Sequence, residues 1–549
     1  MTSKINAHLV SEYFAAYGGE IVVVSPGSRN APLIKAFQAI EHIKCISVVD
    51  ERSAGFVALG LSISTQKLVG VICTSGTALL NYAPAVAEAY YQGFPLIVMS
   101  ADRPLDRIDK GDGQAIRQSN VFLNFQKGFL NIDENAGDKP DIHDDIKRVF
   151  DLAFESKQGP IHFNLPLSEP LYEDSKEENI IVQNDFPIVA KPITLSNELK
   201  NIWKSLDKTM IILGSLPVSK KLESLLNKLS GCVVLYESTS NIELAAGIGS
   251  IDRTLSACNE LKLEPQLVIT IGEQIISKRI KELLKNTSNL QHWHVCEDGK
   301  PLDTFASNSE SIKMDSTQFV TQILKLEDIN PSEYISCWNE GKSKGKQLHD
   351  RFLLNVPYSD LQVFDVILNS IPSNFHLQSG NSSVIRYIQL FDYNQWKSCH
   401  ANRGTSGIDG STSTAVGFSY GIKEPTVLIT GDISFLYDSN GLWNKVIRQD
   451  FRIIVINNNG GGIFRIIPGP QTVPNHEEFF ETIHDIDISH LAKAYGFEFT
   501  QVNNKLDLND ALISFYSASD SPKILEVQTP RKVNDEVLKD YFSYIKNNS

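Results

Sequence analysis

A repeated alternation of short apolar segments with longer amphipathic ones constrains the fold of this chain more than any other feature. In the N-terminal part, the short apolar segments occupy residues 20–27, 43–50, 67–74, 95–102 and 160–167. The stretches between them, such as residues 52–63 and 79–93, carry apolar side chains at helical spacing. Strands that are apolar on both faces are typical of a parallel sheet covered by helices on both sides. We therefore predict an α/β fold.

The same pattern returns twice further along the chain. The later apolar segments occupy residues 209–216, 231–238, 266–273, 425–432, 451–461 and 522–529, and a C-terminal helix is expected over 533–546. Two polar or charged stretches, residues 172–192 and about 325–347, separate the regions. A chain of 549 residues has room for roughly three or four domains. We predict three doubly wound parallel-sheet domains, at residues 1–180, 190–345 and 350–549.

Charge and composition exclude several classes of protein. Acidic residues outnumber basic ones by 65 to 51, which disfavours a nucleic-acid footprint built from basic surface. No apolar stretch approaches the ~20 residues that cross a bilayer, and the N-terminus lacks the features of a signal peptide. The seven cysteines form no C-x-x-C pair and suit a reducing compartment. We expect a cytoplasmic protein without membrane insertion or nucleic-acid binding.

Common nucleotide and metal motifs are missing. The glycine-containing segments at residues 245–252 and 341–346 match neither the dinucleotide fingerprint nor the P-loop. His292 and His294 could share one face of a strand, but no third ligand accompanies them, so we interpret them as packed side chains.

Polar residues follow two strands of the predicted third domain. Gly431 and Asp432 end one strand, and the run NNNGGG at residues 457–462 ends the next. Because the carboxyl ends of parallel strands meet at one edge of a sheet, these groups should lie together. Carboxylate, amide and carbonyl oxygens suit Mg²⁺ that also takes phosphate oxygens, and glycines allow close approach of a ligand. The alternative is a pair of ordinary strand-end turns.

This spacing resembles the thiamine diphosphate (ThDP) fingerprint, G-D-G followed some two dozen residues later by N-N. The chain departs from that pattern at Ile433, where the family has glycine. The resemblance implies that Asp432, the side chain of Asn458 and the carbonyl of Gly460 bind magnesium, with manganese as a substitute. Three consecutive asparagines leave Asn459 as the alternative to Asn458.

A second coenzyme motif stands in the first predicted domain. Glu51 lies at the junction of a strand and a helix in VVDERSAGFVALG, residues 48–60. Taken alone, an acidic residue at a helix start complements the helix dipole. Beside the fingerprint, the resemblance implies that Glu51 is the catalytic glutamate, which hydrogen-bonds the aminopyrimidine ring nitrogen of ThDP. Burial against the coenzyme would raise the pKa of that carboxyl.

Longer motifs narrow the resemblance to one family. They are SPGSRNAPL at residues 25–33, the segment 73–104, NRGTSGIDG at 402–410 and NNNGGGIF at 457–464. Together they resemble the 2-succinyl-5-enolpyruvyl-6-hydroxy-3-cyclohexene-1-carboxylate synthase family of menaquinone biosynthesis, over both coenzyme-binding domains but weakly in the middle one. The resemblance implies decarboxylation of 2-oxoglutarate and conjugate addition of the resulting succinyl carbanion to isochorismate. It also implies a homodimer or dimer of dimers with active sites at the subunit interface.

Four arginines give an independent indication of the substrate class. Arg29, Arg103, Arg386 and Arg403 stand in or beside the motif loops of an acidic protein. Guanidinium groups bind carboxylates in bidentate fashion, so several in one cleft indicate a polyanionic substrate. For any single arginine, the alternative is a surface position near a helix end.

The resemblance also implies a role for each matching residue. Arg386 and Ser382 would hold 2-oxoglutarate; Arg29, Arg103 and Arg403 would hold isochorismate. Ser28 and Gln114 would lie near the reacting centre, Ile408 would support the bent coenzyme, and the other coenzyme contacts would be Gly431, Ile433, Ser434, Ile463 and Phe464. Lys278 and Arg279 would reach in from the middle domain, although a solvated basic helix face is the alternative for this pair.

Two other functions stay open. One is a different ThDP-dependent 2-oxoacid decarboxylase or acetohydroxyacid-synthase-like carboligase. The other is a non-catalytic regulatory subunit with a ThDP fold, although Glu51 argues against it because binding alone does not need that carboxylate.

Overall fold

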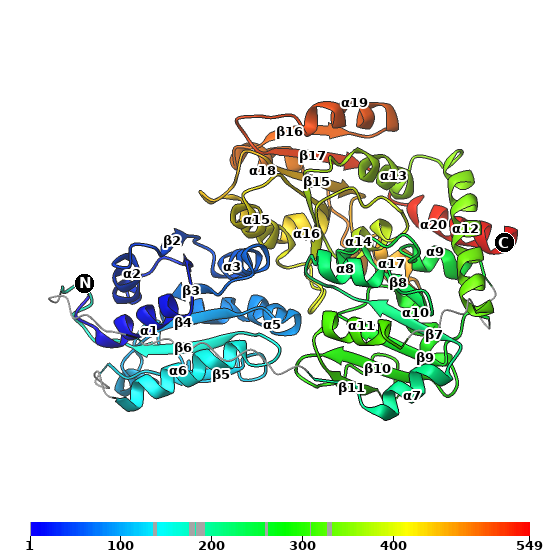
Figure 1. Cartoon of the computed structure of the whole chain (residues 1–549). Coiled ribbons are helices and arrows are strands. Elements are labelled where there is room, and N and C mark those ends of the chain that lie inside the picture. Colours follow the sequence, from blue (N-terminus) through cyan, green and yellow to red (C-terminus); the bar gives the residue numbers. More distant parts are fainter. Residues whose placement is uncertain are drawn as a thin grey trace.

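The computed structural model describes residues 2–134, 140–174, 182, 193–258, 262–307, 309–326 and 332–549. Its strands form three sheets in which all pairings are parallel, each sheet is packed with helices, and the predicted α/β class is confirmed (Figure 1). Beyond Asp174, the predicted polar stretch 172–192 lies outside the described residues except for position 182. Within the described part of the chain, no helix combines the length and apolar character needed to cross a membrane.

The N-terminal sheet has the strand order β2-β1-β3-β4-β6-β5. Its strands are β1 (Ile21–Val24), β2 (Lys44–Ser47), β3 (Val69–Cys73), β4 (Leu96–Asp102), β5 (Gly128–Asn131) and β6 (Ile161–Pro166). Its helices are α1 (Ile5–Ala16), α2 (Ala31–Gln38), α3 (Glu51–Thr65), α4 (Thr77–Asn81), α5 (Ala83–Gln92) and α6 (Pro140–Phe154). Since β1 pairs with β2 on one side and β3 on the other, the strand order reverses there, which is where open α/β sheets bind ligands.

The middle sheet has the order β11-β10-β9-β7-β8. Its strands are β7 (Thr209–Leu213), β8 (Val233–Tyr236), β9 (Leu267–Ile271), β10 (Gln291–Cys296) and β11 (Glu310–Lys313). Its helices are α7 (Asn197–Ser205), α8 (Lys220–Leu226), α9 (Ile251–Ser256), α10 (Lys278–Asn286) and α11 (Ser316–Leu324). His292 and His294 are buried on β10, where both rings hydrogen-bond to Thr270 Oγ1, at 2.9 and 2.8 Å.

The C-terminal sheet has the order β13-β12-β14-β15-β17-β16. Its strands are β12 (His376–Ser379), β13 (Cys399–Ala401), β14 (Thr426–Gly431), β15 (Phe451–Asn457), β16 (Glu498–Val502) and β17 (Lys523–Gln528). Its helices are α13 (Asp360–Ser370), α14 (Ser383–Ile388), α15 (Ser411–Ile422), α16 (Asp432–Tyr437), α17 (Ile463–Ile466), α18 (Ile488–Ala494), α19 (Lys505–Phe515) and α20 (Asn534–Asn548). Gly431 pairs with Ile456, so the loops that follow β14 and β15 begin side by side.

One long helix joins the middle and C-terminal units. Helix α12 (Glu333–Leu353) contacts both α9 and α20. The predicted domain boundary at residues 345–350 therefore falls inside a helix, and the predicted domain limits stay predictions.

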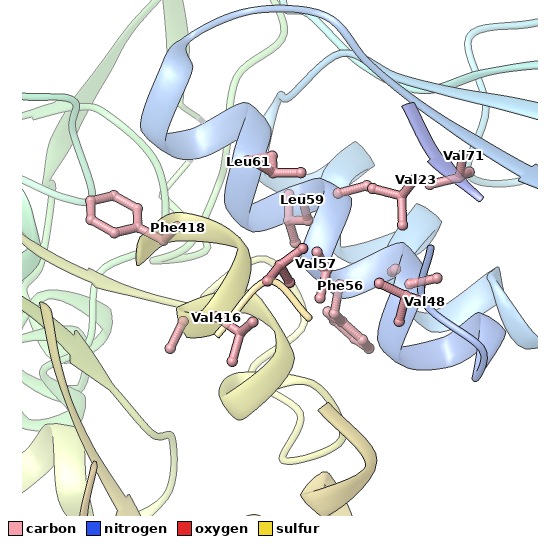
Figure 2. Packing of buried hydrophobic residues seen from close by; sticks show 14 of the residues in the cluster. Val23, Val48, Phe56, Val57, Leu59, Leu61, Val71, Val416 and Phe418 are labelled. Carbon is pink, nitrogen blue, oxygen red and sulfur yellow. The ribbon is translucent and has the colours of Figure 1, made fainter. Parts of the chain in front are cut away.

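Helix α3 connects the N-terminal unit to the C-terminal one by packing against α15 (Figure 1). Figure 2 shows Val57 of α3 and Val416 of α15 at this contact, within a single apolar cluster that extends into both sheets. A Cβ on Gly60 would lie 2.0 Å from the Thr414 carbonyl oxygen, so the two helices meet at backbone distance. This packing fixes the position of Glu51, the first residue of α3.

Candidate active site

Asp432 lies at the edge where β14 and β15 end. It is the first residue of α16 and is 3% exposed. Its Oδ1 accepts a hydrogen bond from the Ile433 N–H at 2.7 Å, and its Oδ2 accepts one from the Gly460 N–H at 2.8 Å. His484 Nε2 lies 3.2 Å from Oδ2, and this contact raises the pKa of His484. The fold thus brings Asp432 and Gly460 together, as the sequence predicts.

The three consecutive asparagines have different environments. Asn457 donates to Glu526 Oε1 at 2.5 Å, and Asn459, at φ +60°, donates to the His484 carbonyl oxygen at 3.2 Å. Asn458 donates to Asp360 Oδ2 at 3.4 Å, and its own Oδ1 is buried with no hydrogen-bond donor among the described residues. A buried acceptor without a donor is rare and suits a cation ligand.

Gly460 is a position where only glycine fits. Its φ is +146°, and a Cβ there would lie 2.7 Å from the Glu481 carbonyl oxygen. Ile463 and Phe464 follow in α17, where the Phe464 ring packs edge-on against Phe480 at 5.6 Å between ring centres.

Glu51 lies where α3 docks on the C-terminal unit. Asp50 caps the helix by accepting from the Arg52 N–H at 2.9 Å, and its Oδ2 accepts from Asn440 Nδ2 at 2.7 Å. Arg52 donates to the Tyr437 carbonyl oxygen at 2.8 Å. Because Tyr437 ends the helix that Asp432 begins, α16 links the docking site of Glu51 to the candidate metal ligand. Burial raises the pKa of Glu51.

Ile408 lies between these two regions. Its carbonyl oxygen accepts a hydrogen bond from Ser434 Oγ at 3.1 Å, in the first turn of α16. Two residues later, a Cβ on Gly410 would lie 2.2 Å from the Phe56 ring of α3. The loop carrying Ile408 is therefore held against both α16 and α3.

Arg386 and Arg403 form a second cluster. The Nε atoms of both guanidinium groups are buried without a hydrogen-bond partner in the described chain. Arg403 Nη1 donates to Asn381 Oδ1 at 2.8 Å, and Ser382 precedes α14, the helix that carries Arg386. The two guanidinium groups are close enough for Arg386 to lower the pKa of Arg403, after the larger effect of desolvation. Such buried donors suit an anionic ligand.

Two carboxylates beside this cluster, buried Glu237 and partly buried Asp252, are already engaged. Glu237 accepts from the Ile276 and Ser277 N–H groups, each at 2.7 Å, and Asp252 accepts from Ser277 Oγ. Desolvation raises the pKa of Glu237 to about 7, against the opposing effect of those hydrogen bonds. Among the described residues, no carboxylate forms an ion pair with Arg386 or Arg403.

The basic pair on α10 divides between two environments. Lys278 faces Arg386, whose charge lowers the pKa of the lysine. Arg279 instead donates to Ser256 Oγ at 2.7 Å and lies over the Phe542 ring, 3.9 Å from its centre. Lys281, one turn after Lys278, is close enough to Arg386 and Arg403 for both charges to lower its pKa, after the larger effect of burial.

Arg29 and Arg103 form a separate group in the N-terminal unit. Arg29 is buried and donates to the Leu167 carbonyl oxygen at 2.7 Å, while Arg103 donates to the Gly113 carbonyl oxygen at 3.1 and 2.9 Å. The candidate residues Ser28 and Gln114 are exposed; Ser28 precedes Arg29, and Gln114 follows Gly113, whose carbonyl oxygen accepts from Arg103. The structure therefore places Arg403 with Arg386 and not with Arg29 and Arg103, with which the sequence analysis grouped it.

Sequence analysis missed four residues that hold the site together: Glu88, Asp360, Asn381 and His484. Asn381 directly precedes the candidate residue Ser382, and Glu88 is the only charged residue of the mostly apolar and aromatic segment 79–91. These two features of the sequence could have indicated Asn381 and Glu88. No comparable feature of the sequence indicates Asp360 or His484.

Comparison with known proteins matches the chain to thiamine pyrophosphate (a synonym of ThDP) enzymes along most of its length. Residues 6–121 match the family described as "Thiamine pyrophosphate enzyme, N-terminal TPP binding domain", and residues 379–527 match its "C-terminal TPP binding domain". Residues 186–377 match "Middle domain of thiamine pyrophosphate".

Curated relatives match almost the whole chain. A protein of Flavobacterium johnsoniae is 42% identical over 546 residues, 98% of each chain. Others from Christiangramia forsetii and Porphyromonas gingivalis are 40% and 36% identical, with at least 96% of each chain covered. All three carry the name 2-succinyl-5-enolpyruvyl-6-hydroxy-3-cyclohexene-1-carboxylate synthase.

Proposed function

The chain belongs to the 2-succinyl-5-enolpyruvyl-6-hydroxy-3-cyclohexene-1-carboxylate synthase family of ThDP enzymes, and we propose that it catalyses the reaction of that name. It decarboxylates 2-oxoglutarate and adds the succinyl unit to isochorismate, as a ThDP-dependent transferase of menaquinone biosynthesis. The observation that carries this proposal is the match along nearly the whole chain. Its cytoplasmic location stays a prediction.

The residues at the β14–β15 edge fit a ThDP–metal complex. Asp432 supplies a buried carboxylate, Asn458 supplies an acceptor that lacks a donor among the described residues, and the Gly460 backbone lies beside Asp432, to which its N–H donates. We propose Asp432, Asn458 and the Gly460 carbonyl as ligands of Mg²⁺, for which Mn²⁺ can substitute. Asn458 is preferred to Asn459 because the Oδ1 of Asn458 is buried without a donor among the described residues, whereas Asn459 is only partly buried.

When bound, ThDP supplies the nucleophilic carbon and accepts the charge left by loss of carbon dioxide. Glu51 holds a proton on its carboxyl oxygen toward the pyrimidine ring nitrogen. Burial favours this protonated form, in agreement with the raised pKa of Glu51. Ile408 supports the bent coenzyme from a loop that Ser434 and Phe56 hold in place.

Arginines bind the substrate carboxylates in this proposal. Arg386, with Ser382, holds 2-oxoglutarate, and its buried unpartnered Nε supports that role. Arg403 holds isochorismate together with Arg29 and Arg103. The remaining proposed contacts are Ser28 and Gln114 near the reacting carbon, Lys278 and Arg279 from α10, and Gly431, Ile433, Ile463 and Phe464 along the coenzyme.

We propose a homodimer, or a dimer of dimers, with active sites at the subunit interface. Within the described part of one chain, the charge of Arg103 acts on Arg29 and the charge of Arg386 acts on Arg403, and neither pair is among the charges that shift the pKa of the other. A second copy can bring the first pair of one chain to the second pair of the other. In that arrangement, mixing inactive Arg29→Ala and Arg403→Ala proteins restores activity, because some hybrid sites carry neither substitution. Absence of any restoration would contradict a shared site.

The test of the reaction is incubation of the protein with ThDP, Mg²⁺, 2-oxoglutarate and isochorismate, followed by mass identification of the product. We expect the synthase product and one carbon dioxide per turnover. Pyruvate in place of 2-oxoglutarate is the matched control, since turnover of pyruvate alone would favour an acetohydroxyacid-synthase-like enzyme. Binding of ThDP without any turnover would favour a non-catalytic subunit.

A further inference from the structure

A buried carboxylate of the N-terminal unit grips the loop that carries Arg403. Glu88, on α5, is 1% exposed. Its Oε1 accepts from the Gly404 N–H at 2.7 Å, and its Oε2 accepts from the Thr405 N–H at 2.7 Å and from Thr405 Oγ1 at 2.5 Å. These contacts span 316 and 317 residues of sequence.

The backbone N–H groups of Gly404 and Thr405 form a specific binding site for the Glu88 carboxylate. A buried carboxylate is costly unless hydrogen bonds or a cation compensate it, and two successive backbone N–H groups form a suitable nest. The approach is close as well, since a Cβ on Gly404 would lie 2.8 Å from the Glu88 carbonyl oxygen and 3.0 Å from its Oε1. The loop therefore needs glycine at position 404 to reach the carboxylate.

The other side of the loop is fixed within the C-terminal unit. Asn381 Nδ2 donates to the carbonyl oxygens of Asn402 and Gly407, at 2.7 and 2.6 Å. Asn381 Oδ1 accepts from Arg403 Nη1 at 2.8 Å. Arg403 is thus held on a loop that Asn381 binds from one unit and Glu88 from the other, while its Nε has no partner among the described residues.

We propose that Glu88 is a positioning residue for substrate binding. It sets the position of Arg403 from the N-terminal unit, so affinity for isochorismate depends on the contact between the two units. This inference rests on the proposed function for the identity of the substrate. The grip of Glu88 on residues 404 and 405 does not depend on that function.

The test is Glu88→Gln, which preserves shape but turns one acceptor into a donor that faces a backbone N–H. Hydrogen exchange at the Gly404 and Thr405 amides should become faster. The KM for isochorismate should rise about tenfold, the scale of one charge-assisted hydrogen bond. The KM for 2-oxoglutarate and the Kd for ThDP should stay within about twofold, because the far end of the loop, at Gly407 and Ile408, remains held by Asn381 and Ser434 when Glu88 changes.

Glu134→Gln is the matched control. Glu134 also lies in the N-terminal unit and accepts a backbone hydrogen bond, from the Ser168 N–H at 3.0 Å, but contacts Lys4 and not the loop. It should lower stability without changing either KM. Thr405→Val is a second variant for the case that Glu88→Gln does not fold. It removes only the hydrogen bond from the Thr405 hydroxyl to Glu88 Oε2. It should raise the KM for isochorismate by less than Glu88→Gln does.

Unchanged exchange at the two amides in the folded variants would overturn the grip of Glu88 on the loop. Faster exchange with an unchanged isochorismate KM, or an equal rise in both KM values, would overturn its positioning role. If the wild-type protein does not consume isochorismate, the proposed function fails and the substrate role fails with it, whereas the exchange result still decides the grip.

Discussion

Single residues give the site its chemistry because the fold buries polar atoms and leaves them unpaired. Within the part of the chain that the structure describes, the Oδ1 of Asn458 and the Nε atoms of Arg386 and Arg403 are of this kind. An unsatisfied buried polar group costs roughly 1–3 kcal/mol of folding free energy. Such groups are expected where a ligand supplies the missing partner, so cofactor and substrate should stabilise this protein as well as react in it.

Asp432→Ala tests the proposed metal ligands at the edge where β14 and β15 end. Because Asp432 supplies the main protein charge on a metal that also binds phosphate oxygens, we expect the Kd for ThDP with Mg²⁺ to rise more than about 100-fold. Calorimetric titration measures it. Asp315→Ala is the control, since Asp315 also begins a helix, by accepting from the Gln318 N–H, but lies in the middle unit. Tight, magnesium-dependent binding by Asp432→Ala would contradict the proposed ligand set.

Glu51→Gln separates coenzyme binding from proton handling. The amide keeps the size of the side chain but cannot share a proton with the ring nitrogen as a carboxyl can. We therefore expect ThDP to bind while kcat falls about 100-fold or more. Steady-state kinetics at saturating ThDP measures this. A kcat within a few-fold of the wild-type value would remove Glu51 from the role.

Arg386→Ala and Arg403→Ala test how the two substrates are distinguished. Losing a partner of a buried carboxylate costs on the order of 2–5 kcal/mol, or at least about 30-fold in affinity. Arg386→Ala should weaken 2-oxoglutarate, and Arg403→Ala should weaken isochorismate, with little change in ThDP affinity. Saturation curves for each substrate, with the other in excess, measure both effects. Because the two guanidinium groups are neighbours, equal losses for both substrates would indicate a common anion field and not two sites.

Some of these residues could be predicted from sequence and others could not, for a physical reason. Asp432 and Glu51 follow strands at recognisable spacing, so a pattern along the chain reveals them. Glu88 acts on a loop 316 residues away, and Asp360 orients Asn458 across 98 residues. Such contacts depend on how the units pack, which local patterns do not encode.

At the level of elements, most predicted strands lie in the interior of the sheets, but β2 and β8 are edge strands that were predicted, and β12 is an interior strand that was missed. β3, β4 and β15 are buried along their whole length, so their sequences are continuous apolar segments. β11 and β16 lie at sheet edges with exposed polar residues, and the sequence analysis missed them for that reason. The expected helix over 79–93 is instead α4 and α5, with the second beginning at a proline.

Gly60→Ala tests the contact between α3 and α15. The added methyl group would lie 2.0 Å from a backbone oxygen, which a side-chain rotation cannot relieve. We expect the free energy of unfolding to fall by about 2 kcal/mol or more. Urea unfolding measures this, with Gly113→Ala as the control, because no atom lies within 4 Å of a Cβ there. An unchanged midpoint for Gly60→Ala would mean that the two helices are not in backbone contact.

In the whole molecule, charged contacts accompany the apolar packing between units. Lys157 of the N-terminal unit pairs with Glu273 of the middle unit at 2.6 Å, and Arg253 of the middle unit pairs with Asp392 of the C-terminal unit at 2.6 Å. Arg253 is 1% exposed, so loss of Asp392 would leave a buried charge unpaired. Since Glu88 and Arg403 also belong to different units, the relative placement of the units contributes directly to the site.

Buried titratable groups predict how the stability of the whole molecule responds to pH. Desolvation lowers the pKa of His162 and His349 to about 3, and that of His292 and His294 to about 4, so all four are neutral when folded. Their ordinary pKa is about 6.5, so below that pH the unfolded chain binds protons that the folded chain does not. These histidines therefore remove stability as the pH falls from about 6.5 toward 4.

Two buried carboxylates act in the opposite direction. Burial raises the pKa of Glu237 and of Asp438 to about 7, so both bind protons in the folded state first and add stability as the pH falls through 7. At lower pH the two carboxylates continue to favour the folded state, by at most one proton each, but the four histidines of the unfolded chain take up more protons and outweigh them. The urea midpoint should therefore change little between pH 7.5 and 6.5 and fall clearly by pH 5.5, as measured by circular dichroism in buffers of equal ionic strength. A midpoint at pH 5.5 equal to or above that at pH 7 would contradict the assignment of these histidines as neutral in the folded protein.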